Sequence, residues 1–342
     1  MPGRLKLRRG VVVSADPLEV EVEGRRRRAW ADENLLGEMR EGDEVVVNVA
    51  ALDLGLGSGG FDVVHVNLSR GLEGGGAEGA HVMKLNYSSL QHPVEPVERP
   101  ASRPERDESR SQATMRQAAV VVLPLHGHLA PVVWAAVQAR PGLRVGYVQT
   151  GGGALPGSFS RDVKLLRKRG LLAGQIAVAP AYGGEHEALS TVGALDAAVE
   201  ELGWEAIAVG PGPGIIGSGT AYGHGGMVAL DNAHAALALG LRTLVSPRLS
   251  SGDPRDRHRG LSHHTRTVLK LLLAPVDVAI PEGESEIVRA LADSKHRLLS
   301  ARADLEGYAA AGLPAGTMGR DLGDDPLFFA APLAAGRLLA EP

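Results

Sequence analysis

The sequence has no cysteine, which excludes disulfide bonds, zinc sites with cysteine ligands and thiol catalysis. It also lacks a strong charge of one sign, because the formal net charge is only −4 at pH 7. We therefore expect neither a global basic field for nucleic acid nor an acidic tail. No stretch approaches the roughly 18 apolar residues that a membrane span needs. The apolar run Val11–Val13 after the basic start is too short for a signal peptide. The expectation is a cytoplasmic protein with no membrane contact.

A length of 342 residues favours two domains over one. The first region, residues 1–91, contains short Val-rich or alternating segments separated by turn residues, at 11–14, 18–23, 25–31, 44–49 and 61–68. This pattern predicts a small N-terminal all-β domain that resembles a barrel or sandwich. Residues 92–114 are rich in proline and charge and predict an extended linker.

Four consecutive arginines, Arg25–Arg28, follow a predicted turn at Gly24. One interpretation is a nucleic-acid contact. Glu19, Glu21 and Glu23 stand on the other side of the same turn, and opposite charges facing each other across a hairpin are the simpler explanation. We therefore do not expect nucleic acid as a partner.

From residue 115 to 342 the pattern changes to strands that alternate with helices. Short apolar runs occur at 118–123, 143–149, 175–179, 206–209, 243–246 and 276–280. The segments between them have helical spacing, and one predicted helix runs from Glu187 to Leu202. This alternation predicts an α/β domain with a mostly parallel, Rossmann-like, doubly wound sheet.

Unusual residues follow one predicted strand after another, where ligands of parallel sheets bind. The first predicted strand is followed by His126-Gly127-His128, and the third by Glu185-His186-Glu187 at a predicted helix start. Glycine-rich connections follow the second and fourth strands. We expect these connections to gather at one edge of the sheet and to form a site.

The glycine-rich connections have two interpretations. Backbone N–H groups of such loops can approach and bind an anion, especially where a helix follows. The same glycines can simply allow long connections to turn tightly. The candidate anion-binding residues are Gly152, Gly153, Gly212, Gly214, Gly217, Gly219 and Thr220.

The segment 253–265 carries eight charged or imidazole side chains in thirteen residues. If Ser262 caps the helix that follows, the first turn contains His263 and His264, and the helix dipole keeps them neutral. Neutral histidines can transfer protons or bind a metal. We therefore take His258, His263 and His264 as candidate catalytic residues. The guanidinium groups that suit a phosphate or carboxylate ligand are Arg255, Arg257 and Arg259.

Two other interpretations of this segment stay open. A divalent metal is one, with Asp253 and Asp256 as ligands beside the local histidines and with His126 and His128 joining from the other connection. A network of aspartates and arginines that only fixes a long loop is the other.

Four segments of the chain resemble an uncharacterised bacterial family, domain-of-unknown-function family 3866. They are Met83–Tyr87, Ala154–Pro156, Gly212–Thr220 and Arg255–Thr265. The charged linker is longer and richer in Arg and Glu than this resemblance implies. The resemblance covers most of the chain and implies no activity.

These patterns together favour an enzyme, a hydrolase or transferase, that acts on a phosphorylated or anionic small molecule by phosphoester hydrolysis or group transfer. A divalent metal is the cofactor that such a site would use. The alternative is a non-catalytic sensor or regulatory protein that binds the same ligand. A homo-oligomer is a common arrangement for such α/β domains and is kept as an expectation.

Overall fold

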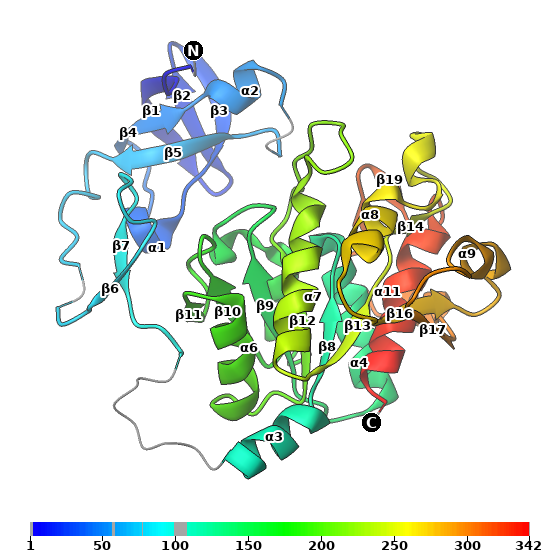
Figure 1. Cartoon of the computed structure of the whole chain (residues 1–342). Helices are drawn as coiled ribbons and strands as arrows, with labels where there is room; N and C mark the ends of the chain where they lie inside the picture. The colour runs from blue at the N-terminus through cyan, green and yellow to red at the C-terminus, as the bar shows by residue number, and fades with distance from the viewer. Residues whose placement is uncertain (1–2, 57–58, 77, 99–107, 342) are drawn as a thin grey trace. The chain divides into compact units, whose positions relative to one another are not determined.

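The computed structural model describes residues 3–56, 59–76, 78–98 and 108–341 (Figure 1). The chain divides into two compact units, Met1–Ala80 and His81–Pro342. Within the described ranges, no helix combines the length and the apolar character that crossing a bilayer requires. The domain limits drawn from the sequence remain predictions, and residues 99–107 of the predicted linker lie outside the described ranges.

The first unit is a closed five-stranded barrel with the strand order β1-β2-β3-β5-β4. Its interior is filled by buried valines, among them Val12, Val20, Val45 and Val47. The strands are β1 (Leu7–Ala15), β2 (Leu18–Val22), β3 (Arg25–Trp30), β4 (Glu44–Asn48) and β5 (Asp62–Asn67), and the short helices are α1 (Glu33–Leu36) and α2 (Ala50–Asp53). The five segments predicted from the sequence therefore all form strands of the barrel.

Two of the four arginines after Gly24, Arg26 and Arg27, form ion pairs with acidic residues of the same unit. Strands β2 and β3 are antiparallel, and their register places Glu19 opposite Arg28 and Glu21 opposite Arg26. Arg26 lies 3.3 Å from a carboxylate oxygen of Glu19. The charge pairing across the hairpin that the sequence predicts is thus present.

The second unit contains an eight-stranded sheet in which each strand pairs in parallel with its neighbours (Figure 1). The strand order is β11-β10-β9-β12-β8-β13-β16-β17. The strands are β8 (Ala119–Val122), β9 (Val145–Thr150), β10 (Gly174–Val178), β11 (His186–Ala188), β12 (Ala206–Pro211), β13 (Arg242–Val245), β16 (Asp277–Pro281) and β17 (Arg297–Ala301). Continuous burial of the central strands on both faces explains why they are almost entirely apolar.

Helices cover both faces of this sheet, as the doubly wound prediction requires. One apolar cluster joins the sheet to α3 (Glu108–Gln117), α6 (Thr191–Glu200), α7 (Val228–Ala238), α8 (His263–Leu271) and α9 (Ser285–Ala290). The other joins it to α4 (Leu129–Ala139), α5 (Arg161–Lys168), α10 (Leu305–Ala310) and α11 (Pro326–Leu339). Figure 1 shows α6 and α7 in front of the strands.

Short strand pairs and 3-10 turns occupy the connections. The pairs are β6 (Val82–Lys84) with β7 (His92–Val94), β14 (Leu249–Ser250) with β15 (Gly260–Leu261), and β18 (Gly316–Thr317) with β19 (Arg320–Asp321). The 3-10 turns are η1 (His126–His128), η2 (Gly157–Phe159), η3 (Gly225–Met227) and η4 (Asp256–His258).

The helix predicted from Glu187 begins later than expected. Residues His186–Ala188 instead form the edge strand β11, which pairs in parallel with β10. Helix α6 begins at Thr191, where the Ser190 hydroxyl caps it by accepting a hydrogen bond from Gly193 N. The edge position explains the error, because only one neighbouring strand and one buried side chain, Ala188, mark this strand.

The segment 84–98, which includes the start of the predicted linker, is fixed to the second unit by polar contacts. Lys84 is 2% exposed, and its Nζ donates to Ala177 O at 2.6 Å and to Ala181 O at 2.9 Å. The same ammonium forms an ion pair with Glu187. Val97 N donates to Glu187 O at 2.7 Å. Residues 84–98 therefore belong to the second unit.

Gly146 in the central strand β9 gives a test of this packing. A Cβ atom at this position would lie 1.7 Å from Cε3 of the buried Trp204 ring, so the indole would have to move. We expect Gly146→Ala to lower the free energy of unfolding by about 1–3 kcal/mol in urea titrations. The control is Gly316→Ala, whose nearest neighbour would be 3.9 Å away, and we expect it to change stability by less than about 0.5 kcal/mol. Equal effects of the two substitutions would contradict this account of the core.

Candidate functional site

The centre of the sheet offers a topological switch point. The chain leaves β8 toward β9 on one side, whereas it leaves the adjacent strand β13 toward β16 on the other. Ligands of open parallel sheets bind at the carboxyl ends of such strand pairs. His128, just after β8, lies here with its Nδ1 2.8 Å from the Ser246 hydroxyl, just after β13. The connections that leave β12 and β13 carry most of the unusual residues of the sequence.

Four imidazole rings meet in these two connections. The rings of His224 and His264 are stacked, with centroids 3.6 Å apart and planes at 8°. His258 lies with its centroid 4.9 Å from both His263 and His264. The rings of His263 and His264 are 4.4 Å apart. The three histidines predicted as catalytic thus lie together, and His224 joins them from the connection after β12.

Ser262 contacts two of the neighbouring histidines, His258 and His264. Its hydroxyl caps α8 by accepting a hydrogen bond from His264 N at 3.2 Å, which confirms the predicted cap. The same hydroxyl lies 2.8 Å from Nδ1 of His258. One short side chain therefore fixes both the start of the helix and the orientation of the ring that precedes it.

His224 reaches the cluster from a small hairpin in the glycine-rich connection. Ser218 N donates to Gly223 O at 2.7 Å, and Gly225 N donates to Ile216 O at 2.8 Å. These bonds turn the chain back so that His224 enters the site at its base, 7% exposed. The sequence interpretation missed this residue. The feature of the sequence that could have identified it is an isolated histidine between Gly223 and Gly225, directly before the helix.

The cluster favours neutral imidazoles. Burial lowers the pKa of His258 to about 3 and that of His264 to about 2, and the charge of Arg248 acts in the same direction. Burial also lowers the pKa of His224 and that of His263. All four rings are therefore uncharged at neutral pH, so each can accept a proton or donate a lone pair to a metal.

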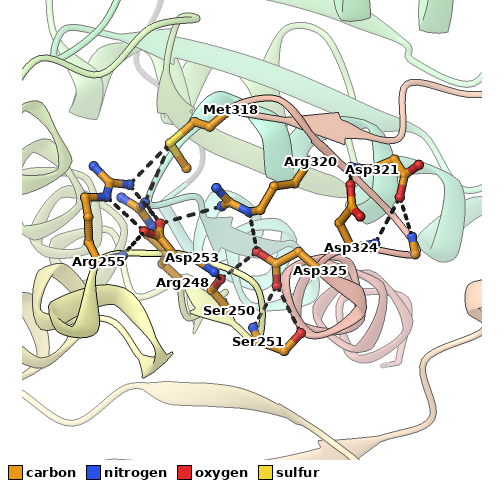
Figure 2. A network of polar contacts seen from close by, with 11 residues as sticks. Arg248, Ser250, Ser251, Asp253, Arg255, Met318, Arg320, Asp321, Asp324 and Asp325 are labelled. Atoms are coloured by element: carbon orange, nitrogen blue, oxygen red, sulfur yellow. Dashed lines mark hydrogen bonds and ion pairs between the residues drawn. The ribbon is translucent and has the colours of Figure 1, made fainter.

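Figure 2 shows the polar network beside these rings. The buried carboxylate of Asp253 accepts hydrogen bonds from Arg255 Nε at 2.9 Å and Nη2 at 2.8 Å, and from Arg248 Nη2 at 3.3 Å. The hydrogen bonds from Arg255 hold the pKa of Asp253 well below its usual range. Arg320 contributes a fourth contact, 3.6 Å from the same carboxylate.

Arg320 extends the network to Asp325 at the start of α11. Its Nε donates to a carboxylate oxygen of Asp325 at 3.1 Å, and the hydroxyl of Ser250 donates to the same carboxylate at 2.6 Å. The connection 246–262 is thereby tied to the C-terminal helix. The predicted network of aspartates and arginines is present, and it borders the histidines rather than replacing them.

Arg248 links the two groups and was not among the predicted residues. It is 5% exposed, and its Nη1 lies 3.5 Å from Nδ1 of His264. Burial lowers its pKa to about 10, which still leaves the guanidinium charged at neutral pH. Its Nε is buried with no hydrogen-bond partner among the described residues. The position just after β13 is the signal that could have identified it.

The remaining charged residues of segment 253–265 lie at the surface. Asp256, Arg257 and Arg259 are exposed, and the closest pair, Arg259 and Asp256, is 4.0 Å apart. Arg255 is partly exposed and has its donors on Asp253 and near the sulfur of Met318. These arginines lie in the same segment as His258, His263 and His264, at positions that solvent reaches.

The four residues predicted as metal ligands do not come together. Both oxygens of Asp253 are engaged by guanidinium groups, and the side chain of Asp256 is 97% exposed. His126 points to the Ser160 hydroxyl, 2.7 Å from its Nε2, whereas His128 points to Ser246. Among the described residues, the group that could hold a metal ion is His224, His263 and His264.

Several predicted anion-binding glycines are used for contacts between loops. A Cβ atom at Gly152 would lie 2.4 Å from Gly225 O, and one at Gly153 would lie 2.1 Å from Gly212 O. A side chain at Gly212 would meet Ala154 O at 2.2 Å. These glycines allow the connection after β9 to lie directly on the connection after β12, which positions the hairpin of His224.

The exposed part of the glycine-rich connection forms the tip of the hairpin. Gly214 and Gly219 have φ angles of 75° and 81°, which favour glycine, and Gly217 lies opposite His224. The hydroxyl of Thr220 accepts a hydrogen bond from Gly223 N at 3.0 Å and so stabilises the turn. These four residues are exposed and leave their outer surface open.

Comparison with known proteins places the chain in a family but assigns no activity. No curated protein and no solved structure matches it significantly. The family model described as "Protein of unknown function (DUF3866)" matches residues 28–336. This match covers the first unit from Arg28 on, with β4 and β5 of the barrel, nearly all of the α/β unit and all the residues of the imidazole cluster. The chain therefore belongs to the DUF3866 family, as the resemblance in its motifs predicts.

Proposed function

We propose that the protein is an enzyme that acts on a phosphorylated or otherwise anionic small molecule, by phosphoester hydrolysis or group transfer. The observation that supports this most is the convergence of four neutral imidazoles with the buried guanidinium of Arg248 beside the switch point of the sheet. Neutral histidines supply proton transfer, and a buried guanidinium stabilises a negative charge that develops during reaction.

The charge balance of the network favours an anion. Arg248, Arg255 and Arg320 contribute three positive charges, and Asp253 and Asp325 contribute two negative charges. One positive charge is left over, and the neutral rings do not compensate it. Because Nε of Arg248 is buried and lacks a partner, an incoming anion would supply the missing acceptor.

Each predicted residue has a role in this proposal. His263 is the proposed proton-transfer residue, because its ring is partly exposed and its Nε2 has no partner among the described residues. His258 and His264 hold and polarise the neighbouring rings. Arg255, Arg257 and Arg259 draw the substrate to the cluster. The backbone of Gly212–Thr220 and of Gly152 and Gly153 borders the second anionic group of a larger substrate.

The first test compares binding with turnover. Phosphate release from sugar phosphates, nucleotides and p-nitrophenyl phosphate would be measured together with calorimetric binding of inorganic phosphate. We expect His263→Gln to lower turnover about 100-fold or more and to leave phosphate affinity nearly unchanged. The control is His186→Gln on β11 at the edge of the sheet, which we expect to retain full turnover.

The possible results separate the proposal from its rival. A wild-type protein that binds phosphate but releases none from these substrates would instead be a sensor that binds an anionic ligand. A protein with neither phosphate binding nor turnover would contradict the whole assignment. Loss of phosphate affinity in Arg248→Gln, with an unchanged circular dichroism spectrum, would support the anion site.

A further inference from the structure

Three imidazole rings of the cluster come together in the way that metal ligands do. One ring nitrogen from each of His224, His263 and His264 lies within 4.8 Å of the other two. The three side chains come from two connections that leave neighbouring regions of the sheet, after β12 and after β13. No carboxylate is included in this group, so its donors are all nitrogen.

We propose that His224, His263 and His264 bind one divalent metal ion, with Zn²⁺ as the best match to three imidazole ligands. The inference rests on the proposed function and deepens it, because it names the cofactor of the same site; with the ion bound, His263 would serve as its ligand in place of the proton-transfer role given above. Metal binding can be measured without any substrate, however, so the two proposals can fail separately. Three histidines leave a fourth coordination position for water or substrate, and the metal would supply Lewis acidity there.

The ring of His224 is already oriented as a ligand. Its Nε2 lies 3.1 Å from Ala221 O and donates a hydrogen bond to this carbonyl. The proton is thereby fixed on Nε2, and the lone pair is left on Nδ1. A backbone carbonyl on the second ring nitrogen is the usual partner of a metal-bound histidine.

Two ring nitrogens of the group lack any partner among the described residues. His224 is more than nine-tenths buried, and its Nδ1 has no hydrogen-bond partner within the described ranges. Nε2 of His263 is buried and unbonded as well. Buried polar atoms are nearly always satisfied in proteins, so two such atoms in one small cluster point to a missing ligand.

Gly226 keeps the space in front of the nitrogens open. A Cβ atom at this position would lie 3.1 Å from Nδ1 of His224 and 3.4 Å from Nδ1 of His264. Both nitrogens therefore face the same point, and even a methyl group there would compete with an ion. Zn–N bonds of about 2.0–2.1 Å require the three nitrogens to be about 3.3 Å apart. Tilting the stacked rings about their soft χ2 angles would bring them closer.

The surroundings suit a metal ion that also binds an anion. The rings are neutral at physiological pH because burial lowers the pKa of each, and the neutral form is the one that binds metal. Three neutral ligands leave the charge of the ion uncompensated. An anionic substrate would compensate it. The ion would replace the contact of 3.5 Å between Arg248 Nη1 and Nδ1 of His264, and the guanidinium would then be free to contact the same anion.

The test uses the full chain without an affinity tag, after treatment with a chelator and its removal. Calorimetry with Zn²⁺ should show one ion per chain, and Co²⁺ should give the visible absorption bands of a tetrahedral site. His224→Gln and His263→Gln should each lower Zn²⁺ affinity by more than about 100-fold. A loss of that size exceeds the effect of removing a residue that only hydrogen-bonds to a ligand. His186→Gln is the matched control and should bind Zn²⁺ like the wild type.

Gly226→Ala is a further test, because this variant leaves all the histidines in place. It should weaken Zn²⁺ binding because its methyl group occupies the space between two ligand nitrogens. The inference is overturned if the wild-type chain binds no Zn²⁺ or Co²⁺, or if both His→Gln variants bind Zn²⁺ as tightly as the wild type. Phosphate binding and turnover without any metal would reject the metal site and keep the proposed function. Zn²⁺ binding without turnover would keep the metal site and reject the proposed enzymatic function.

Discussion

Asp253→Ala is expected to lower the free energy of unfolding by about 3–5 kcal/mol. The carboxylate is fully buried and is the shared acceptor of Arg248, Arg255 and Arg320. Its removal leaves the guanidinium of Arg248 buried without its counter-ion, and an uncompensated buried charge is costly. Urea titrations followed by circular dichroism at pH 7.5 would measure the loss.

A neighbouring aspartate provides the matched control. Asp256 is only three residues away, but its side chain is 97% exposed and its nearest arginine contact is 4.0 Å. We expect Asp256→Ala to change stability by less than about 0.5 kcal/mol. A loss below about 1 kcal/mol for Asp253→Ala would show that water or another group satisfies the arginines. The network would then not be what stabilises this loop.

The sequence predicted one part of this network and missed another. Segment 253–265 identified the site because its charges and imidazoles had no use in a core, and it indicated pairing between aspartates and arginines. The partners Arg320 and Asp325 were not foreseen, because they are about 70 residues later in the chain and lie in an unremarkable charged stretch. Contacts over such separations depend on where α11 packs, and local patterns do not encode this.

The sequence predicted the strands that are buried on both faces better than the strands at the edges of the sheet. The six predicted strands of the α/β unit are all present because their apolar runs reflect burial on both faces. The edge strands β11 and β17 were missed. Each pairs with a single strand of the sheet and has a single buried residue, and the sequence of β11, His186-Glu187-Ala188, is mostly polar. Parallel edge strands of this kind are difficult to distinguish from the start of a helix.

Within the site, sequence patterns identified the residues that are close along the chain. His258, His263 and His264 were predicted together and lie together. His224 was missed because its place beside His264 depends on a hairpin whose hydrogen bonds involve backbone atoms. His126 and His128 have the spacing of a ligand pair, but they meet different hydroxyl groups, those of Ser160 and Ser246.

Acid is expected to destabilise the protein strongly through those two histidines. Burial lowers the pKa of His126 to about 4 and that of His128 to about 3, whereas an unfolded histidine titrates near 6.5. Below pH 6.5 the unfolded chain therefore binds protons that the folded chain excludes, so stability falls as the pH falls. Between pH 8 and pH 5 each histidine should remove about 2 kcal/mol from the free energy of unfolding.

Asp162 acts in the opposite direction and provides an internal control of the sign. Burial raises its pKa to about 6, so the folded state favours its protonated form and gains stability as the pH falls through 6. Its contribution over the same interval is about 1 kcal/mol, which is too small to offset the two histidines.

Three variants separate these contributions in urea titrations at pH 8 and pH 5. His128→Gln should reduce the acid-induced loss of stability by about 2 kcal/mol, and His126→Gln offers the same test at the second ring. Asp162→Asn should instead deepen the loss by about 1 kcal/mol, because it removes a group that stabilises the folded state in acid. If all three variants kept the pH dependence of the wild type, the buried rings would already carry their protons in the folded protein, and the lowered pKa values assigned to His126 and His128 would be wrong.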